Sequence, residues 1–197
     1  LSDGAITDGM VQYNKSVRLF RGEDMQQGIL VFGANGCGKS TAGRKLAEKL
    51  GMRFLDAEDY AFVDSAVPFA KERPREEYTA LVQQEIFKGD DFVLAAVKGD
   101  FGMEAISRYT CAFYLETDCA TRMMRVRKRS FDRFGSRVLR GGDLYESEER
   151  FFQFAQNRSI EQITQWAEDN LKCPVVQIDA TLPVDTVVRL MIEHFRR

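Results

Sequence analysis

Short apolar runs alternate along the chain with segments in which apolar residues recur every three or four positions. The short runs, bounded by turn residues, predict buried strands at 29–32, 52–55, 91–97, 111–115 and 175–178. The longer spacing predicts helices over 39–50, 76–88, 101–108, 117–131, 146–170 and 184–195. Two stretches are expected to be irregular or broken helix: 60–75 and 132–145. Strands that alternate with helices are typical of a parallel sheet covered on both faces, so we expect an α/β fold.

One segment carries a complete phosphate-binding motif. Residues 33–40, Gly-Ala-Asn-Gly-Cys-Gly-Lys-Ser, fit G-x-x-x-x-G-K-[ST] and lie between the first expected strand and the first expected helix. Glycines there let successive N–H groups form an anion site at a helix N-terminus. Lys39 is expected to reach the β- and γ-phosphates, and Ser40 to bind Mg²⁺. The expected nucleotide-binding residues are Gly33, Ala34, Asn35, Gly36, Cys37, Gly38, Lys39, Ser40 and Thr41.

The composition suits one globular domain. The chain has 197 residues, 44% of them hydrophobic and 29% charged, and its net charge is −2. This charge predicts neither a nucleic-acid nor a membrane partner, and no apolar stretch approaches the roughly 20 residues that span a bilayer. The first residues lack a secretory pattern and the four cysteines lack C-x-x-C pairing, so we expect free thiols and a cytoplasmic location. The single histidine, His194, argues against Ser–His and Cys–His hydrolase mechanisms.

The segment 33–59 resembles the start of the nucleoside-monophosphate kinase and shikimate kinase group. After the phosphate loop come a helix at 43–50 and a short strand that ends in acids, Phe-Leu-Asp-Ala-Glu, at 54–58. An arginine-rich region and the strand–loop–helix run at 178–183 continue the resemblance. The segment 137–152 also resembles small uncharacterised ATP-binding proteins near this group.

The resemblance implies a P-loop three-layer sandwich with ATP and Mg²⁺ as cofactors. Its sheet would have five parallel strands in the order 2-3-1-4-5, and an arginine-rich helical lid would span about 120–158. The likeness covers most of a kinase-like domain at 28–197. Residues 1–27 would then be an N-terminal extension, in which 17–20 fit either an extra strand or a short helix.

Basic residues are concentrated between positions 122 and 140, where a single acid, Asp132, accompanies eight of them. Four of the arginines would share one face of a helix: Arg122, Arg125, Arg129 and Arg133. Such a run is often only a solvated face. Its position nevertheless matches the lid of the family, whose arginines clamp the transferring phosphoryl group. The resemblance therefore implies catalytic roles, with Arg125, Arg129 and Arg140 as the strongest candidates.

Acidic residues follow the second expected strand, at the edge of the sheet where ligands bind. The resemblance implies that Asp56 acts in catalysis by holding hydrated Mg²⁺, and that Glu58 binds an acceptor hydroxyl, with Asp59 as a competitor. A solvated acidic turn is the alternative. After the third strand, Asp100 is a further candidate for the metal or else a turn residue. The segment 98–102 lacks the Gly-Gly-Gly loop that shikimate would want, which leaves the acceptor open.

Other basic residues lie where related kinases bind their acceptor. Arg73 and Arg75 would grip a phosphate or carboxylate, although neighbouring glutamates make a mixed-charge loop equally consistent with the sequence. Arg150 and Arg158 fall on the next expected helix, where similar kinases place another phosphate-contacting arginine.

These patterns predict an ATP-dependent phosphotransferase that acts on a small metabolite or a nucleotide. The adenine is expected to pack against the turn that contains Thr181 and Pro183, and the absence of a guanine-binding motif favours ATP over GTP. The alternative is an ATP-binding regulatory NTPase or switch without a small acceptor. A nucleic-acid role would use the cations at 122–140, but no aromatic residues are interleaved to support it. The oligomeric state stays open.

Overall fold

The computed structural model describes residues 26–63 and 71–196, so the segment 17–20 lies outside the described part of the chain. At its centre is a sheet of five parallel strands: β1 (Gly28–Phe32), β2 (Arg53–Asp56), β3 (Phe92–Ala96), β4 (Tyr109–Glu116) and β5 (Val175–Asp179). Their order across the sheet is β2-β3-β1-β4-β5, which confirms the predicted order. Because β1 is the central strand, the loop that follows it lies at the middle of the carboxyl edge of the sheet.

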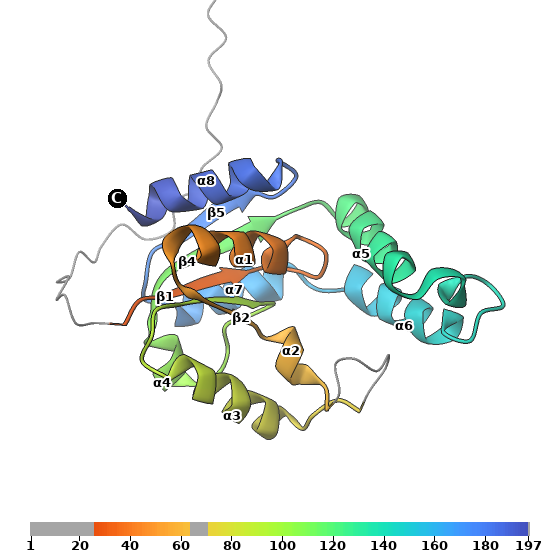
Figure 1. Ribbon diagram of the computed structural model, residues 1–197, viewed down its shortest axis with the longest axis horizontal. Helices are drawn as coiled ribbons and strands as arrows, with labels where there is room; N and C mark the ends of the chain where they lie inside the picture. Colours follow the sequence, from red (N-terminus) through yellow and green to blue (C-terminus); the bar gives the residue numbers. More distant parts are fainter. Residues whose placement is uncertain (1–25, 64–70, 197) are drawn as a thin grey trace, which may run out of the picture.

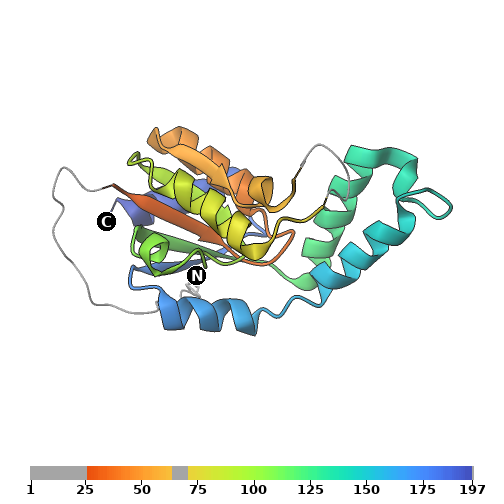
Figure 2. The same ribbon diagram turned by 90° about the horizontal axis from the view of Figure 1, so that it is seen from below.

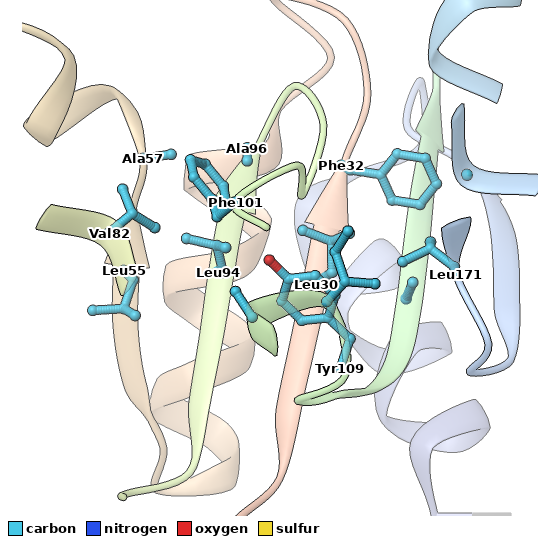
Figure 3. Packing of buried hydrophobic residues seen from close by; sticks show 14 of the residues in the cluster. Leu30, Phe32, Leu55, Ala57, Val82, Leu94, Ala96, Phe101, Tyr109 and Leu171 are labelled. Carbon is cyan, nitrogen blue, oxygen red and sulfur yellow. The ribbon is translucent and has the colours of Figure 1, made fainter. Parts of the chain in front are cut away.

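Both faces of the sheet are buried, as the continuous apolar runs predict. Successive side chains of a strand point to opposite faces. Ile29 and Val31 pack on one face with α1 and α8, whereas Leu30 and Phe32 pack on the other with α3, α4 and α7. Figure 3 shows part of this second cluster. The helices of these outer layers are α1 (Lys39–Leu50), α3 (Arg75–Ile86), α4 (Met103–Ile106), α7 (Glu161–Asn170) and α8 (Val184–Phe195). The result is a three-layer sandwich (Figures 1 and 2).

A helical arm extends beyond the sheet, on the side where the phosphate loop lies (Figures 1 and 2). It consists of α5 (Cys119–Phe134), the 3₁₀ helix η1 (Gly135–Val138) and α6 (Tyr145–Gln156). The carboxylate of Asp118 caps α5 by accepting the N–H of Thr121 at 2.8 Å. The two helices share a small apolar core of their own, formed by Met123, Val126, Phe152 and Ala155. The arm therefore occupies the place of the predicted lid.

The prediction of one long helix over 146–170 is wrong. The structure has two helices, α6 and α7, separated by a turn at 157–160. Ser159 lies just before the second helix, and its hydroxyl oxygen accepts the N–H of Gln162 in the first turn at 3.1 Å. The spacing Ser-x-x-Gln is a known signal for a helix start, and the apolar periodicity of both helices conceals it. The break allows α6 to belong to the arm while α7 packs on the sheet.

Smaller differences concern the ends of elements. The short helix α2 (Glu58–Ala61) begins directly after β2, inside the acidic turn, and α5 continues to Phe134. All four cysteines lie in the described ranges and are free thiols, as expected. Burial raises the pKa of Cys111 to about 12, so its thiol stays neutral. No helix within 26–63 and 71–196 combines the length and the apolar character needed to cross a membrane.

Candidate active site

The phosphate loop joins the carboxyl end of β1 to the first turn of α1. Gly36 and Gly38 have φ angles of 84° and 97°, which residues with a side chain rarely adopt. A Cβ at Gly36 would also collide with the carbonyl oxygen of Arg122 in α5, so glycine is required there for a second reason. A glycine-rich loop of this kind, placed before a helix N-terminus, offers main-chain N–H groups to an anion.

Lys39 lies inside this loop. Its side chain is only 5% exposed, and its ammonium group donates a hydrogen bond to the carbonyl oxygen of Ala34 at 3.1 Å. A buried cation at this position suits the phosphates of a nucleotide. The next two residues belong to the first turn of α1, where Ser40 is partly buried and Thr41 is exposed.

A small pocket of about 190 Å³ opens on one side of the loop. Cys37, Gly38 and Thr41 form its floor, and Leu182 and Val184 come from the turn before α8 and from the start of that helix. Arg125 of α5 also lines this pocket, where its guanidinium donates to the carbonyl oxygen of Ala180 at 3.0 Å. The pocket thus combines the phosphate loop with an apolar wall, which suits the base and sugar of a nucleotide.

A larger cavity of about 830 Å³ lies between the sheet edge and the helical arm. Asn35 of the phosphate loop and Glu58 at the start of α2 contribute to it from the sheet side. Three arginines of the arm, Arg158 just beyond it and several phenylalanines also line this cavity. Its volume falls within the range of small-molecule sites.

The two cavities therefore meet at the phosphate loop. Cys37 and Gly38 face the small pocket, while Asn35, two residues earlier, faces the larger cavity. A phosphate chain held by this loop would have a nucleoside pocket on one side and a second ligand site on the other.

Predicted catalytic arginines of α5 are divided between these cavities. Arg125 lines the small pocket, whereas Arg129, one turn later, lines the large cavity. Arg129 forms an ion pair of 3.8 Å with Glu58, so two predicted site residues from distant parts of the sequence are brought together. Both side chains are largely exposed, which leaves the pair weak and open to rearrangement by a ligand.

Two further arginines line the cavity, Arg150 of α6 and Arg158 in the turn that follows this helix. Arg158 stacks on the ring of Phe154, with 4.4 Å from the guanidinium carbon to the ring centroid. Burial lowers the pKa of the Arg158 guanidinium, while the charge of Glu58 acts in the opposite direction. Within the described ranges, no carboxylate lies at ion-pair distance from Arg158 or from Arg150 of α6.

Arg122, in contrast, has a structural role. It is 3% exposed and donates hydrogen bonds to the carbonyl oxygens of Asn35 at 3.2 Å and Ala155 at 3.3 Å. The guanidinium therefore joins the phosphate loop to both helices of the arm. Its charge belongs to a buried contact rather than to the solvated basic face that the sequence alone allows.

The other predicted acceptor-binding arginines are engaged elsewhere. Arg73 donates to the carbonyl oxygen of Phe62 at 2.7 Å and pairs with Glu77 at 3.2 Å. Arg75 pairs with Asp100 at 3.1 Å on an exposed surface. Neither arginine lines either of these two cavities, and neither does Asp100, the candidate metal ligand.

Three remaining candidates also lie outside both linings. Arg140 is exposed in the loop after η1. Thr181 donates from its N–H and hydroxyl to the carboxylate of Asp179, at 2.8 and 2.6 Å, and Pro183 starts α8. Their neighbours in the turn line the small pocket instead, so the predicted segment is adjacent to that pocket although these two residues are not part of its lining.

Residues that fit Mg²⁺ are Ser40, in the first turn of α1, and Asp56, at the carboxyl end of β2. Asp56 is buried and accepts the N–H of Glu58 at 3.1 Å. Burial raises the pKa of neighbouring Asp59, and the charge of Asp56 adds to this effect. The described part of the chain holds no group of three or more metal-binding side chains. Because Mg²⁺ in kinases relies on waters and substrate phosphates, a hydroxyl and one carboxylate suit it together with a nucleotide.

A family model described as shikimate kinase matches residues 35–173, which is most of the chain. The chain belongs to the shikimate kinase family. It is also 28% identical over 178 residues to the uncharacterized protein YqaC of Bacillus subtilis (strain 168), covering 86% of this chain and 98% of that protein. A probable gluconokinase of Mus musculus is 48% identical over 46 residues, 23% of this chain and 25% of the mouse protein.

Two solved structures share the fold of this shikimate kinase family member. Shikimate kinase from Acinetobacter baumannii, in complex with shikimate, has a TM-score of 0.51 at 20% identity, covering 87% of this chain and 96% of that one. Deoxyadenosine kinase from M. mycoides has a TM-score of 0.50 at 16% identity, covering 86% and 98%. The family and the shared P-loop kinase fold make this protein a small-molecule kinase.

Sequence reasoning missed several residues that line the larger cavity of this shikimate kinase family member. They are Ser130, Phe134, Glu148, Phe151 and Phe154. Glu148 is 5% exposed and accepts a hydrogen bond from the Ser130 hydroxyl, which joins α6 to α5. Arg150, Phe154 and Arg158 recur every four positions, which places them on one side of a helical segment. The sequence does not show that this side borders a cavity, because that depends on where the fold places α6.

Proposed function

We propose that this protein transfers the γ-phosphoryl group of ATP, with Mg²⁺, to an oxygen of a small acceptor bound in the larger cavity. The observation that supports this most directly is the position of the phosphate loop between two cavities. Cys37 and Gly38 open to the nucleoside pocket and Asn35 to the acceptor cavity. A phosphoryl group held there has a donor on one side and an acceptor on the other.

The residues have separate roles in this proposal. Main-chain N–H groups of the loop and the Lys39 ammonium hold the phosphates and stabilise the charge that develops during transfer. Mg²⁺, held by Ser40 and assisted by Asp56, would neutralise the phosphate oxygens. Arg125 positions the nucleoside, and Arg129 with Glu58 positions the acceptor near the loop. Phosphoryl transfer consists mostly of such positioning and charge stabilisation.

The larger cavity also bears on the alternative of a regulatory NTPase. A switch without an acceptor has no need for a cavity of about 830 Å³ that opens to the phosphate loop and is lined by several arginines. This feature favours a kinase.

The test is a screen for acceptor-dependent ADP release. The full chain is incubated with ATP and Mg²⁺, alone and with nucleoside monophosphates, nucleosides and sugar acids in turn. We expect one class of acceptor to raise the rate of ADP release at least about tenfold over the hydrolysis by water, together with a new phosphoester detected by phosphorus NMR. ATP binding without acceleration by any of these compounds would favour the switch instead.

A further inference from the structure

Helix α6 lines the larger cavity with alternating cations and aromatic rings. Arg150 and Phe154 are one turn apart, Phe151 lies beside them, and Arg158 follows just beyond the helix. The guanidinium of Arg158 stacks on the ring of Phe154, which orients it. Phe134 at the end of α5 adds a further ring to the same cavity. This wall offers flat apolar surfaces next to positive charge.

The cavity is also lined by two buried residues that carry hydrogen-bond acceptors, Asn35 and Glu148, and the side-chain oxygen of Asn35 lacks a donor in the described part of the chain. The side-chain oxygen of Asn35 is buried, in a residue 7% exposed, and it has no hydrogen-bond partner among the described residues. Glu148 accepts only the hydroxyl of Ser130, and within 26–63 and 71–196 no cation forms an ion pair with it. Buried acceptors without donors are costly, so a ligand that supplies N–H groups would be favoured here.

The arginines of the cavity call for a ligand group of negative charge. Arg150 and Arg158 have no carboxylate at ion-pair distance in the described part of the chain. An anionic group on the ligand would satisfy them through charge-assisted hydrogen bonds. One cavity is thus lined by aromatic rings, by oxygen atoms that can accept hydrogen bonds from N–H groups, and by guanidinium groups without a carboxylate partner among the described residues.

We propose that the acceptor is a planar nitrogen heterocycle that carries N–H donors and is joined to a phosphate, the chemistry of a nucleoside monophosphate. This inference rests on the proposed function, since it names the acceptor class for the same cavity. An aliphatic sugar acid has the anion but neither a flat ring nor ring N–H groups, so it would leave the α6 wall and Asn35 without partners.

The reaction for this acceptor is balanced without a base. An oxygen of the acceptor phosphate forms a bond to the γ-phosphorus, and the bond from the γ-phosphorus to the β–γ bridging oxygen breaks. The products are ADP and a nucleoside diphosphate. Because the acceptor phosphate is already ionised near neutral pH, no side chain has to remove a proton.

A calorimetric titration compares acceptors that differ only in the ring. The full chain is saturated with AMP-PNP and Mg²⁺ to fill the donor pocket, and is then titrated with each of the four common nucleoside 5′-monophosphates and with ribose 5-phosphate. We expect at least one nucleotide to bind on the order of tenfold more tightly than ribose 5-phosphate, because ribose 5-phosphate lacks the stacking base. Equal affinity of ribose 5-phosphate and all four nucleotides would overturn the proposal.

Matched variants test which wall recognises the ring. Phe154→Leu keeps an apolar side chain but removes the aromatic face, and we expect it to reduce the preference for the nucleotide about fivefold. Phe131→Leu is the control, because Phe131 belongs to the same arm and is similarly exposed, at 48% against 57%, but does not line the cavity. Glu148→Gln should weaken the binding of the nucleotide and leave the binding of ribose 5-phosphate unchanged. An unchanged preference in both Phe154→Leu and Glu148→Gln would contradict the proposal.

Failure of this inference can be told apart from failure of the proposed function. If AMP-PNP binds and gluconate or shikimate drives ADP release while no nucleotide does so, the kinase is retained and the acceptor class is wrong. If AMP-PNP with Mg²⁺ does not bind, the proposed function fails. The titrations with nucleotide and ribose 5-phosphate still decide the ring preference of the cavity in that case.

Discussion

The phosphate loop and the arm-side wall of the larger cavity serve the same proposed reaction, but they are built differently. The loop is a run of eight consecutive residues whose shape depends on glycines, and whose ligand groups are mostly main-chain N–H. The wall consists of side chains from α5, α6 and the turn at 157–160. A loop built from main chain suits any nucleoside triphosphate, whereas a wall built from side chains selects its ligand. In the proposed reaction, recognition of the donor would therefore depend on one local segment, and recognition of the acceptor would depend on side chains brought together by the fold.

The largest effect is expected within the loop, from Lys39→Ala. The substitution removes the one buried ammonium group that faces the phosphates, and we expect kcat to fall about 10³-fold by loss of transition-state stabilisation. The KM of the acceptor should change little, because the wall remains intact. The measurement is acceptor-dependent ADP release. Turnover close to that of the unmodified protein would remove Lys39 from the proposed mechanism.

Arg129 and Arg125 allow the donor side to be separated from the acceptor side with two substitutions on one helix. Arg129→Gln should lower kcat about 10²-fold and raise the KM of the acceptor, because Arg129 lines the acceptor cavity beside Glu58. Arg125→Gln should raise the KM of ATP about three- to tenfold and leave acceptor binding unchanged, since it lines only the small pocket. Steady-state kinetics, with the concentrations of ATP and of the acceptor varied in turn, measure both KM values and kcat for each variant. The reverse pattern would show that the two cavities have been assigned the wrong way round.

The phosphate loop and the arm-side wall also differ in how much of each can be predicted from the sequence. The order of the sheet and the phosphate loop are predictable because both depend on short local patterns, namely apolar runs and glycine spacing. The pairing of Arg129 with Glu58 depends on where the fold places α5 relative to α2, and the separation of Arg125 from Arg129 depends on which cavity each turn of α5 lines. No periodicity contains that information. Arg75 and Asp100 are likewise separate candidates in the sequence, and only the fold brings them together as an ion pair.

Arg122 connects the two regions, and its removal tests whether they act as one unit. Arg122→Met keeps the apolar stem but leaves the carbonyl oxygens of Asn35 and Ala155 without this donor, and we expect a loss of about 2 kcal/mol in unfolding free energy. Lys128→Met is the control on the exposed side of the same helix, where a change within about 0.5 kcal/mol is expected. Urea unfolding measures both. Equal effects of the two substitutions would mean that the loop and the arm are held together by other contacts.

The smallest effect is expected at Asp100, outside both regions. The side chains of Asp100 and Arg75 are 52% and 62% exposed, so their ion pair contributes at most about 0.5 kcal/mol to stability. Asp100→Asn should therefore leave kcat within about twofold and the Mg²⁺ dependence of turnover unchanged, since Asp100 lines neither cavity. Asp56→Asn, at the end of β2, should by contrast shift the Mg²⁺ dependence to higher concentration. A shift of similar size in Asp100→Asn would mean that Asp100 does contribute to the metal site. The phosphate-binding region would then extend further along the sheet edge than the two cavities indicate.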